Sequence, residues 1–153
     1  MESALLKVPY TVQFVQGIIE SGQQVVVFSD HVHTTELIGA KFGKDGATIT
    51  GKTPVQERDR IVQRFQRGEI KVLAATTGTM SAGWTLTSAA HAVFNDLPWV
   101  PGDFLQAIKR IHRIGQKSKC FIYNIVTTQL DQMIMATLKE KTKVLSEAIR
   151  KTC

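Results

Sequence analysis

Short apolar runs recur along the chain, and helical patterns separate them. The runs lie at 25–28, 71–75, 91–94 and 120–126, and an alternating pattern at 47–50 indicates one more strand. The run 25–28 is unbroken and rich in β-branched residues, as is typical of a strand buried on both faces. Strands that alternate with helices predict a parallel sheet with helices on both sides. We therefore predict an α/β three-layer sandwich with five or six parallel strands.

Helical periodicity occupies the intervals between the strands. The predicted helices cover 10–21, 32–42, 54–66, the segment that ends near 116, and 130–149. The third should begin with Thr53 as N-cap, Pro54 in the first turn and Gln56 completing a capping box. Ligands of such sheets bind at the carboxyl ends of the strands. The loops expected there are 29–31, 51–53, 76–84 and 95–102.

Composition limits the protein class. The 153 residues match one ordinary domain, 1–153, and 43% hydrophobic content suffices for a core. No apolar run approaches a membrane span, and the N-terminus lacks a secretory signal pattern. The two cysteines, Cys120 and Cys153, indicate no disulfide framework. We expect an intracellular protein, cytoplasmic or nucleoid-associated in a bacterium or phage and nuclear in a eukaryote.

Positive charge is concentrated in the second half of the chain. The net charge is +6; residues 1–76 carry 9 Lys and Arg against 8 Asp and Glu, and residues 77–153 carry 10 against 5. An excess of this kind favours polyanionic partners, nucleic acid above all, although many basic domains bind none.

The segment 106–116 places Gln106, Arg110 and Arg113 at i, i+4 and i+7. In a helix that ends at Gly115 they would fall on one side. Three apolar residues would face the core on the other: Phe104, Ile108 and Ile111. Guanidinium groups are permanently charged and suit phosphate oxygens. Helical spacing alone equally allows a solvated basic face.

The segment 46–53 matches the phosphate-loop pattern G-x-x-x-x-G-K-[ST]. That mechanism needs a strand before Gly46, but a helical pattern precedes it, and the residues between the two glycines read as a strand. We therefore interpret Gly51, Lys52 and Thr53 as a turn that contacts a phosphate of some other partner, at a helix N-terminus.

These motifs, in this order, resemble the C-terminal motor lobe of Swi/Snf-family superfamily-2 DNA translocases. The matching segments are 25–30, 51–54 with 57–58, the loop 76–87, 96–101, 106–116 and 126–127. The most specific is Gln-Ala-x-x-Arg-x-x-Arg-x-Gly-Gln at 106–116. The resemblance covers nearly the whole chain and implies a RecA-like lobe that forms half of an ATPase.

The resemblance implies that ATP and Mg²⁺ are held mainly by an N-terminal lobe of the same parent chain. Arg110 and Arg113 would be arginine fingers, with Arg113 the first choice for the γ-phosphate. Gln106 and Gly83 would complete this side of the nucleotide site. No phosphate loop or acid pair is found in these 153 residues, so we expect the isolated chain to be inactive.

The resemblance also implies contacts with the backbone of double-stranded DNA, on which a monomer would translocate stepwise. The positions that match are Ser29, Gly51, Lys52, Thr53, Thr76, Thr77 and Gly78. Hydroxyls, amides and one lysine suit phosphates and read no bases.

The loop 79–86 departs from the family pattern Ala-Gly-Gly-x-Gly-Leu-Asn-Leu. Gly83 is retained, Trp84 stands at the leucine and Thr85 at the asparagine. Trp84 could stack on a base or pack beneath the loop. His31 and His33 lack further metal ligands nearby, and no metal site is expected.

Two other functions stay open at this point. One is a free-standing nucleic-acid-binding or regulatory module that has lost the motor. The other is a self-contained phosphate-loop enzyme that uses residues 46–53.

Overall fold

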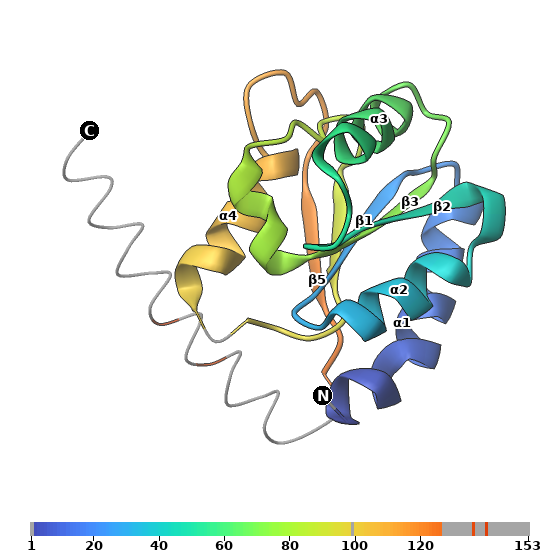
Figure 1. Cartoon of the computed structure of the whole chain (residues 1–153), viewed down its shortest axis with the longest axis vertical. Helices are drawn as coiled ribbons and strands as arrows, with labels where there is room; N and C mark the ends of the chain where they lie inside the picture. Colours follow the sequence, from blue (N-terminus) through green and yellow to red (C-terminus); the bar gives the residue numbers. More distant parts are fainter. Residues whose placement is uncertain (1, 99, 127–135, 137–139, 141–153) are drawn as a thin grey trace.

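Five parallel strands form one sheet, and helices cover both of its faces (Figure 1). The structure, a computed structural model, describes residues 2–98, 100–126, 136 and 140. The strands lie in the order β2-β3-β1-β4-β5. Their bounds are β1 Val25–Ser29, β2 Gly46–Ile49, β3 Val72–Thr76, β4 His91–Phe94 and β5 Phe121–Asn124. The predicted strands and their parallel pairing are confirmed.

Helices α1 (Glu2–Glu20) and α2 (Val32–Ala40) cover one face, and α3 (Val55–Gln66) and α4 (Pro101–Ile111) the other (Figure 1). Two short 3-10 helices, η1 (Gly43–Asp45) and η2 (Thr77–Ala82), lie in connections. The predicted helix at 130–149 falls almost wholly outside the described residues.

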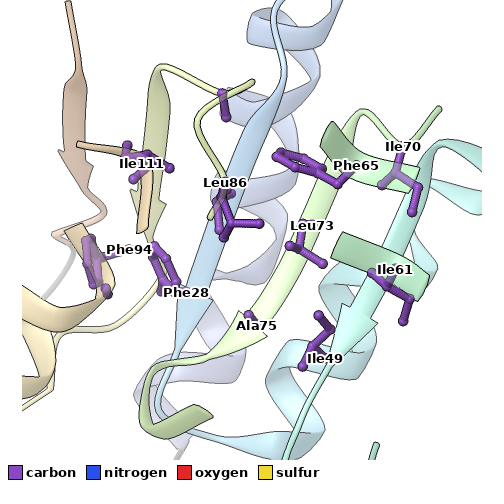
Figure 2. Packing of buried hydrophobic residues seen from close by; sticks show 14 of the residues in the cluster. Phe28, Ile49, Ile61, Phe65, Ile70, Leu73, Ala75, Leu86, Phe94 and Ile111 are labelled. Atoms are coloured by element: carbon purple, nitrogen blue, oxygen red, sulfur yellow. The ribbon is translucent and has the colours of Figure 1, made fainter. Parts of the chain in front are cut away.

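Alternation along each strand divides the core into two layers. In β1, Val25 and Val27 pack toward α1 and α2, whereas Val26 and Phe28 pack toward α3 and α4. The second layer is shown in Figure 2, where Phe28 and Phe94 lie side by side with ring centroids 5.0 Å apart. The central strands β1 and β3 are buried at every position, and the three-layer prediction is confirmed.

Three local predictions are wrong. Helix α1 begins at Glu2, eight residues before the expected start, and contains Pro9. Helix α3 has Pro54 as its N-cap and no capping side chain. The Thr53 hydroxyl instead accepts a hydrogen bond from the Thr50 amide at 3.0 Å, which closes the preceding turn. Helix α4 ends at Ile111 and not at Gly115.

The structure confirms that 46–53 is no phosphate loop, because Gly46 starts β2, which pairs with β3 along its length. Gly46 instead allows close packing between β2 and the end of helix α2. A Cβ on Gly46 would lie 2.5 Å from the Gly39 carbonyl oxygen and 3.0 Å from Phe42 Cβ. Glycine therefore lets helix α2 pack closely on the edge strand.

Replacing Gly46 by alanine is expected to lower the free energy of unfolding by about 1–3 kcal/mol, the usual cost of overpacking. The change in stability should appear in urea denaturation followed by circular dichroism. Gly17→Ala is the matched control: it lies inside α1 with nothing within 4 Å of an added Cβ. There alanine should stabilise by roughly 0.5–1 kcal/mol. Equal stability of the Gly46 variant and the parent would contradict the packing role.

Candidate functional site

Helix α4 carries the first half of the arginine motif and is fixed to the core by its apolar side. Ala107 and Ile111 are fully buried, and Phe104 and Ile108 pack against the same cluster, as predicted. Gln106 and Arg110 lie elsewhere on the helix surface. This anchoring gives the arginine a rigid base.

Gln106 orients the Arg110 side chain through two contacts. Arg110 Nε donates to the Gln106 carbonyl at 3.0 Å, and Arg110 Nη2 donates to Gln106 Oε1 at 3.0 Å. Two bonds from one planar fork fix both its position and its plane. The predicted pairing of these two residues on one helix face is confirmed.

Arg113 lies beyond the end of α4, so its predicted place on the helical wedge is wrong. Tertiary contacts end the helix early: the Arg110 carbonyl accepts from the Leu86 amide at 2.8 Å, and the Ile111 carbonyl accepts from Gln116 Nε2 at 2.9 Å. These partners replace the bonds that another helical turn would make. Gly115, with φ of +101°, lies in the turn that follows.

Arg113 nevertheless reaches the same place as Arg110. Its Nη1 donates to the carbonyls of Gly83 and Trp84, both at 3.2 Å. A Cβ on Gly83 would lie 3.5 Å from Arg110 Nη1, and φ at Gly83 is +86°. Glycine is therefore favoured both by its backbone conformation and by the approach of a guanidinium. Gln106, Gly83 and the two arginines form one group, which we call the arginine cluster.

The arginine cluster carries two positive charges. Within the part of the chain that the structure describes, neither guanidinium forms an ion pair with a carboxylate. Burial lowers the pKa of Arg110, which is 8% exposed, and the charge of Arg113 lowers that pKa further. Two adjacent cations, one partly desolvated and one exposed, make a site suited to an anion such as a phosphate group.

A second group of polar side chains lies where β1 and β4 end. Asp96 accepts from Ser29 Oγ at 2.6 Å, from the Asp30 amide at 2.8 Å and from Asn95 Nδ2 at 3.1 Å. Thr77 Oγ1 lies 3.0 Å from Asp30 Oδ1. Asp96 thus connects the carboxyl ends of two neighbouring strands. The sequence analysis assigned no role to Asp96, although this residue is the first of the segment 96–101 that carries the family resemblance.

The seven positions matched to DNA contacts differ in exposure. Ser29, Thr76 and Thr77 are buried, and Thr53 is half-buried. Gly51, Lys52 and Gly78 are exposed. The hydroxyls of Ser29 and Thr77 already have internal partners, so they support the neighbouring backbone. Lys52 is the exposed cation among these positions, whereas the amides of Lys52 and Thr53 already donate to Thr50.

Arg58 is a second residue to which sequence reasoning gave no role. Its Nε donates to the Thr53 carbonyl at 2.7 Å and its Nη2 to the Gly51 carbonyl at 3.2 Å. The same guanidinium lies over the Trp84 ring, 5.8 Å from its centroid. Trp84 also packs against the core cluster, which is the second of the two arrangements considered for this side chain.

The residues present fit part of a nucleotide site. Two guanidiniums and a glycine suit phosphate oxygens, whereas no group of three or more His, Cys, Asp or Glu that could hold a metal ion occurs among the described residues. The guanidiniums therefore fit a phosphate group. In the described part of the chain, no helix has the length and apolarity needed to cross a bilayer.

The sheet order, the two helical layers and the arginine cluster beside the sheet define a RecA-like lobe of the helicase type. Residues 7–115 match the family described as helicase conserved C-terminal domain. The chain belongs to this family, and it is related to the Swi/Snf branch of helicase-like ATPases.

The curated relatives are much longer proteins. The chain is 33% identical over 154 residues to the SWI/SNF-related matrix-associated actin-dependent regulator of chromatin subfamily A-like protein 1 of Xenopus tropicalis, covering 95% of this chain and 16% of that protein. It is 35% identical over 143 residues to the DNA repair and recombination protein RDH54 of Saccharomyces cerevisiae (strain JAY291), covering 88% and 15%. The chain thus spans about one sixth of either relative.

A solved structure shows the same fold. The C-terminal part of the Fun30 ATPase domain superposes with a TM-score of 0.76 at 21% sequence identity, over 86% of this chain and 44% of that one. At this identity the likeness establishes the RecA-like architecture.

Proposed function

We propose that this chain is the C-terminal motor lobe of a DNA-dependent ATPase that translocates on double-stranded DNA. The observation that carries the proposal is the arginine cluster: two guanidiniums meet at Gly83 without a carboxylate partner among the described residues. An N-terminal lobe of the same parent chain would complete the ATP site. We expect the protein to act as a monomer in the compartment that holds the DNA.

The two arginines have different tasks in this proposal. Arg113 is exposed, and a small movement away from the Gly83 and Trp84 carbonyls frees its fork for the γ-phosphate. Arg110 is held by Gln106 and supplies a fixed positive charge beside it. ATP with Mg²⁺ supplies the phosphoryl group. The guanidiniums stabilise the negative charge that spreads over that group in the transition state.

The DNA contact is proposed at the carboxyl edge of the sheet. Lys52 is exposed in a tight turn in which the Thr53 amide donates to the Thr50 carbonyl at 3.1 Å. Gly51 and Gly78 are also exposed. Contacts to phosphates alone are independent of base sequence, which suits a protein that moves along a duplex.

A motor lobe differs from a self-contained phosphate-loop enzyme in one measurable respect. If the arginine cluster completes a site on another lobe, the chain alone should not hydrolyse ATP. We expect turnover by the purified 153-residue chain to equal that of its Arg113→Ala variant in a coupled phosphate-release assay. Turnover above that control would contradict the proposal that another lobe is required.

An assay of the full-length protein, which contains the other lobe, distinguishes a binding module from a motor. In the full-length protein, turnover that double-stranded DNA stimulates and that depends on Arg113 supports the motor. DNA binding without any such turnover supports the module.

A further inference from the structure

We propose that Arg58 is a positioning residue that couples the DNA-facing turn 51–53 to the finger residue Arg113 through Trp84. The inference rests on the proposed function, because it concerns how occupancy of one phosphate site is transmitted to the other. It names a connection between the turn 51–53 and Arg113, which lie about sixty residues apart in the sequence.

The first end of the connection is the turn itself. The two carbonyls that Arg58 holds, those of Gly51 and Thr53, flank Lys52 on either side. Charge-assisted bonds of this kind are stronger than neutral ones. Any shift of the turn toward a DNA phosphate therefore moves the guanidinium of Arg58.

The second end is Trp84. Its ring lies beneath the Arg58 guanidinium, 5.8 Å from centroid to Cζ, and its carbonyl accepts from Arg113 Nη1 at 3.2 Å. One residue thus touches Arg58 with its side chain and Arg113 with its backbone. A cation placed over an indole ring is attracted by the ring's quadrupole, so the two move together.

The rest of helix α3 is fixed, so displacement passes through the Arg58 side chain. Ile61 and Phe65 anchor the helix in the core, with 7% and 0% of their surface exposed. The neighbouring Arg60 pairs with Glu57 at 2.8 Å and stays in solvent. Arg60 therefore provides a control that has the same charge and the same helix without the contact to Trp84.

The tryptophan at position 84, which differs from the resembled loop pattern, provides the contact between Arg58 and the loop. Where the resembled loop pattern has leucine, this chain has an aromatic ring under a guanidinium. Leucine is smaller than tryptophan but also apolar, and it offers no cation–π attraction. Trp84→Leu is thus a second variant that keeps an apolar side chain at this position and removes the contact.

Trp84 also reports on the coupling directly. In a Trp99→Phe background it is the remaining tryptophan, since the chain has two. A short fluorescein-labelled duplex gives the binding constant by anisotropy, and an unlabelled duplex gives the change in Trp84 emission. We expect DNA to change this emission in the parent and in Arg60→Ala. The change should be lost in Arg58→Ala and Arg58→Lys, while both still bind duplex through Lys52.

In the full-length protein, Arg58→Ala and Trp84→Leu should each lower DNA-stimulated ATP turnover by about tenfold, which corresponds to about 1.4 kcal/mol. Turnover without DNA and the KM for ATP should stay unchanged when they are measured well below the melting temperature of each variant. A purely structural role would lower the melting temperature and both rates together, which would overturn the inference. Arg58→Lys should not restore DNA-stimulated turnover, because lysine lacks the planar guanidinium that spans two carbonyls.

The outcomes separate this inference from the proposed function. If DNA changes Trp84 emission equally with and without Arg58, the coupling is wrong and the motor proposal stands. Equal effects of Arg60→Ala and Arg58→Ala would likewise overturn the coupling, since only general charge would matter. If the parent chain binds no duplex and Lys52→Ala changes nothing in the full-length protein, the DNA contact and the coupling both fail.

Discussion

Arg113→Ala in the full-length protein is expected to lower DNA-stimulated ATP turnover by about 10³–10⁵, the range found for arginine fingers in other nucleotide hydrolases. The reason is that Arg113 alone in the arginine cluster combines an exposed guanidinium with a position beside Gly83. ATP binding should change little, because the other lobe holds most of the nucleotide. Steady-state turnover at saturating duplex and equilibrium binding of a fluorescent ATP analogue measure the two effects.

Two control variants sharpen this result. Lys117→Ala removes another exposed cation a few residues away and should leave turnover unchanged. Arg113→Lys keeps the charge but loses the planar fork, so it should recover only a small part of the rate. Parent-like turnover in Arg113→Ala would show that this guanidinium does not reach the transferring phosphoryl group.

Asp96→Ala is expected to lower the free energy of unfolding by about 3–5 kcal/mol. Asp96 is 8% exposed and accepts hydrogen bonds from Ser29, Asp30 and Asn95. Removing the carboxylate leaves buried donors without an acceptor. For a domain of this size the melting temperature should fall by roughly 10 °C, measured by calorimetry or circular dichroism.

The appropriate comparison is with an exposed aspartate. Asp59→Ala lies on the solvent side of α3 and should change stability by no more than about 0.5 kcal/mol. Asp96→Asn keeps the shape and one acceptor oxygen, so its effect should be intermediate. If the Asp96→Ala and Asp59→Ala variants have the same melting temperature, the carboxyl ends of β1 and β4 are held together by something other than the Asp96 side chain.

The polar group around Asp96 also extends to the first helix. Asn95 donates to the Ala4 carbonyl at 3.0 Å and accepts from Thr11 Oγ1 at 2.6 Å. Helix α1 is therefore tied to the end of β4, about ninety residues later in the chain. This contact accounts for part of the early start of α1, since periodicity from residue 10 onward gave no sign of it.

The layers of the fold were predictable because burial leaves a local trace in the sequence. The run 25–28 is apolar at every position, and Val26 and Phe28 face one helical layer while Val25 and Val27 face the other. The order of the strands in the sheet was not predictable in this way. It depends on which crossovers pack best, and no single segment records that.

The chain's own sequence determined the alternation of strands and helices, the resemblance carried by 106–116, and the rejection of a phosphate loop at 46–53. Tertiary structure alone decided where α4 ends and what Arg113 touches. The Leu86 amide donates to the Arg110 carbonyl near the end of the helix, and Gly83 accepts from Arg113 and lies beside the Arg110 guanidinium. The physical reason is distance along the chain: periodicity reports the burial of neighbouring residues, whereas hydrogen bonds between segments some thirty residues apart form only once the layers have packed.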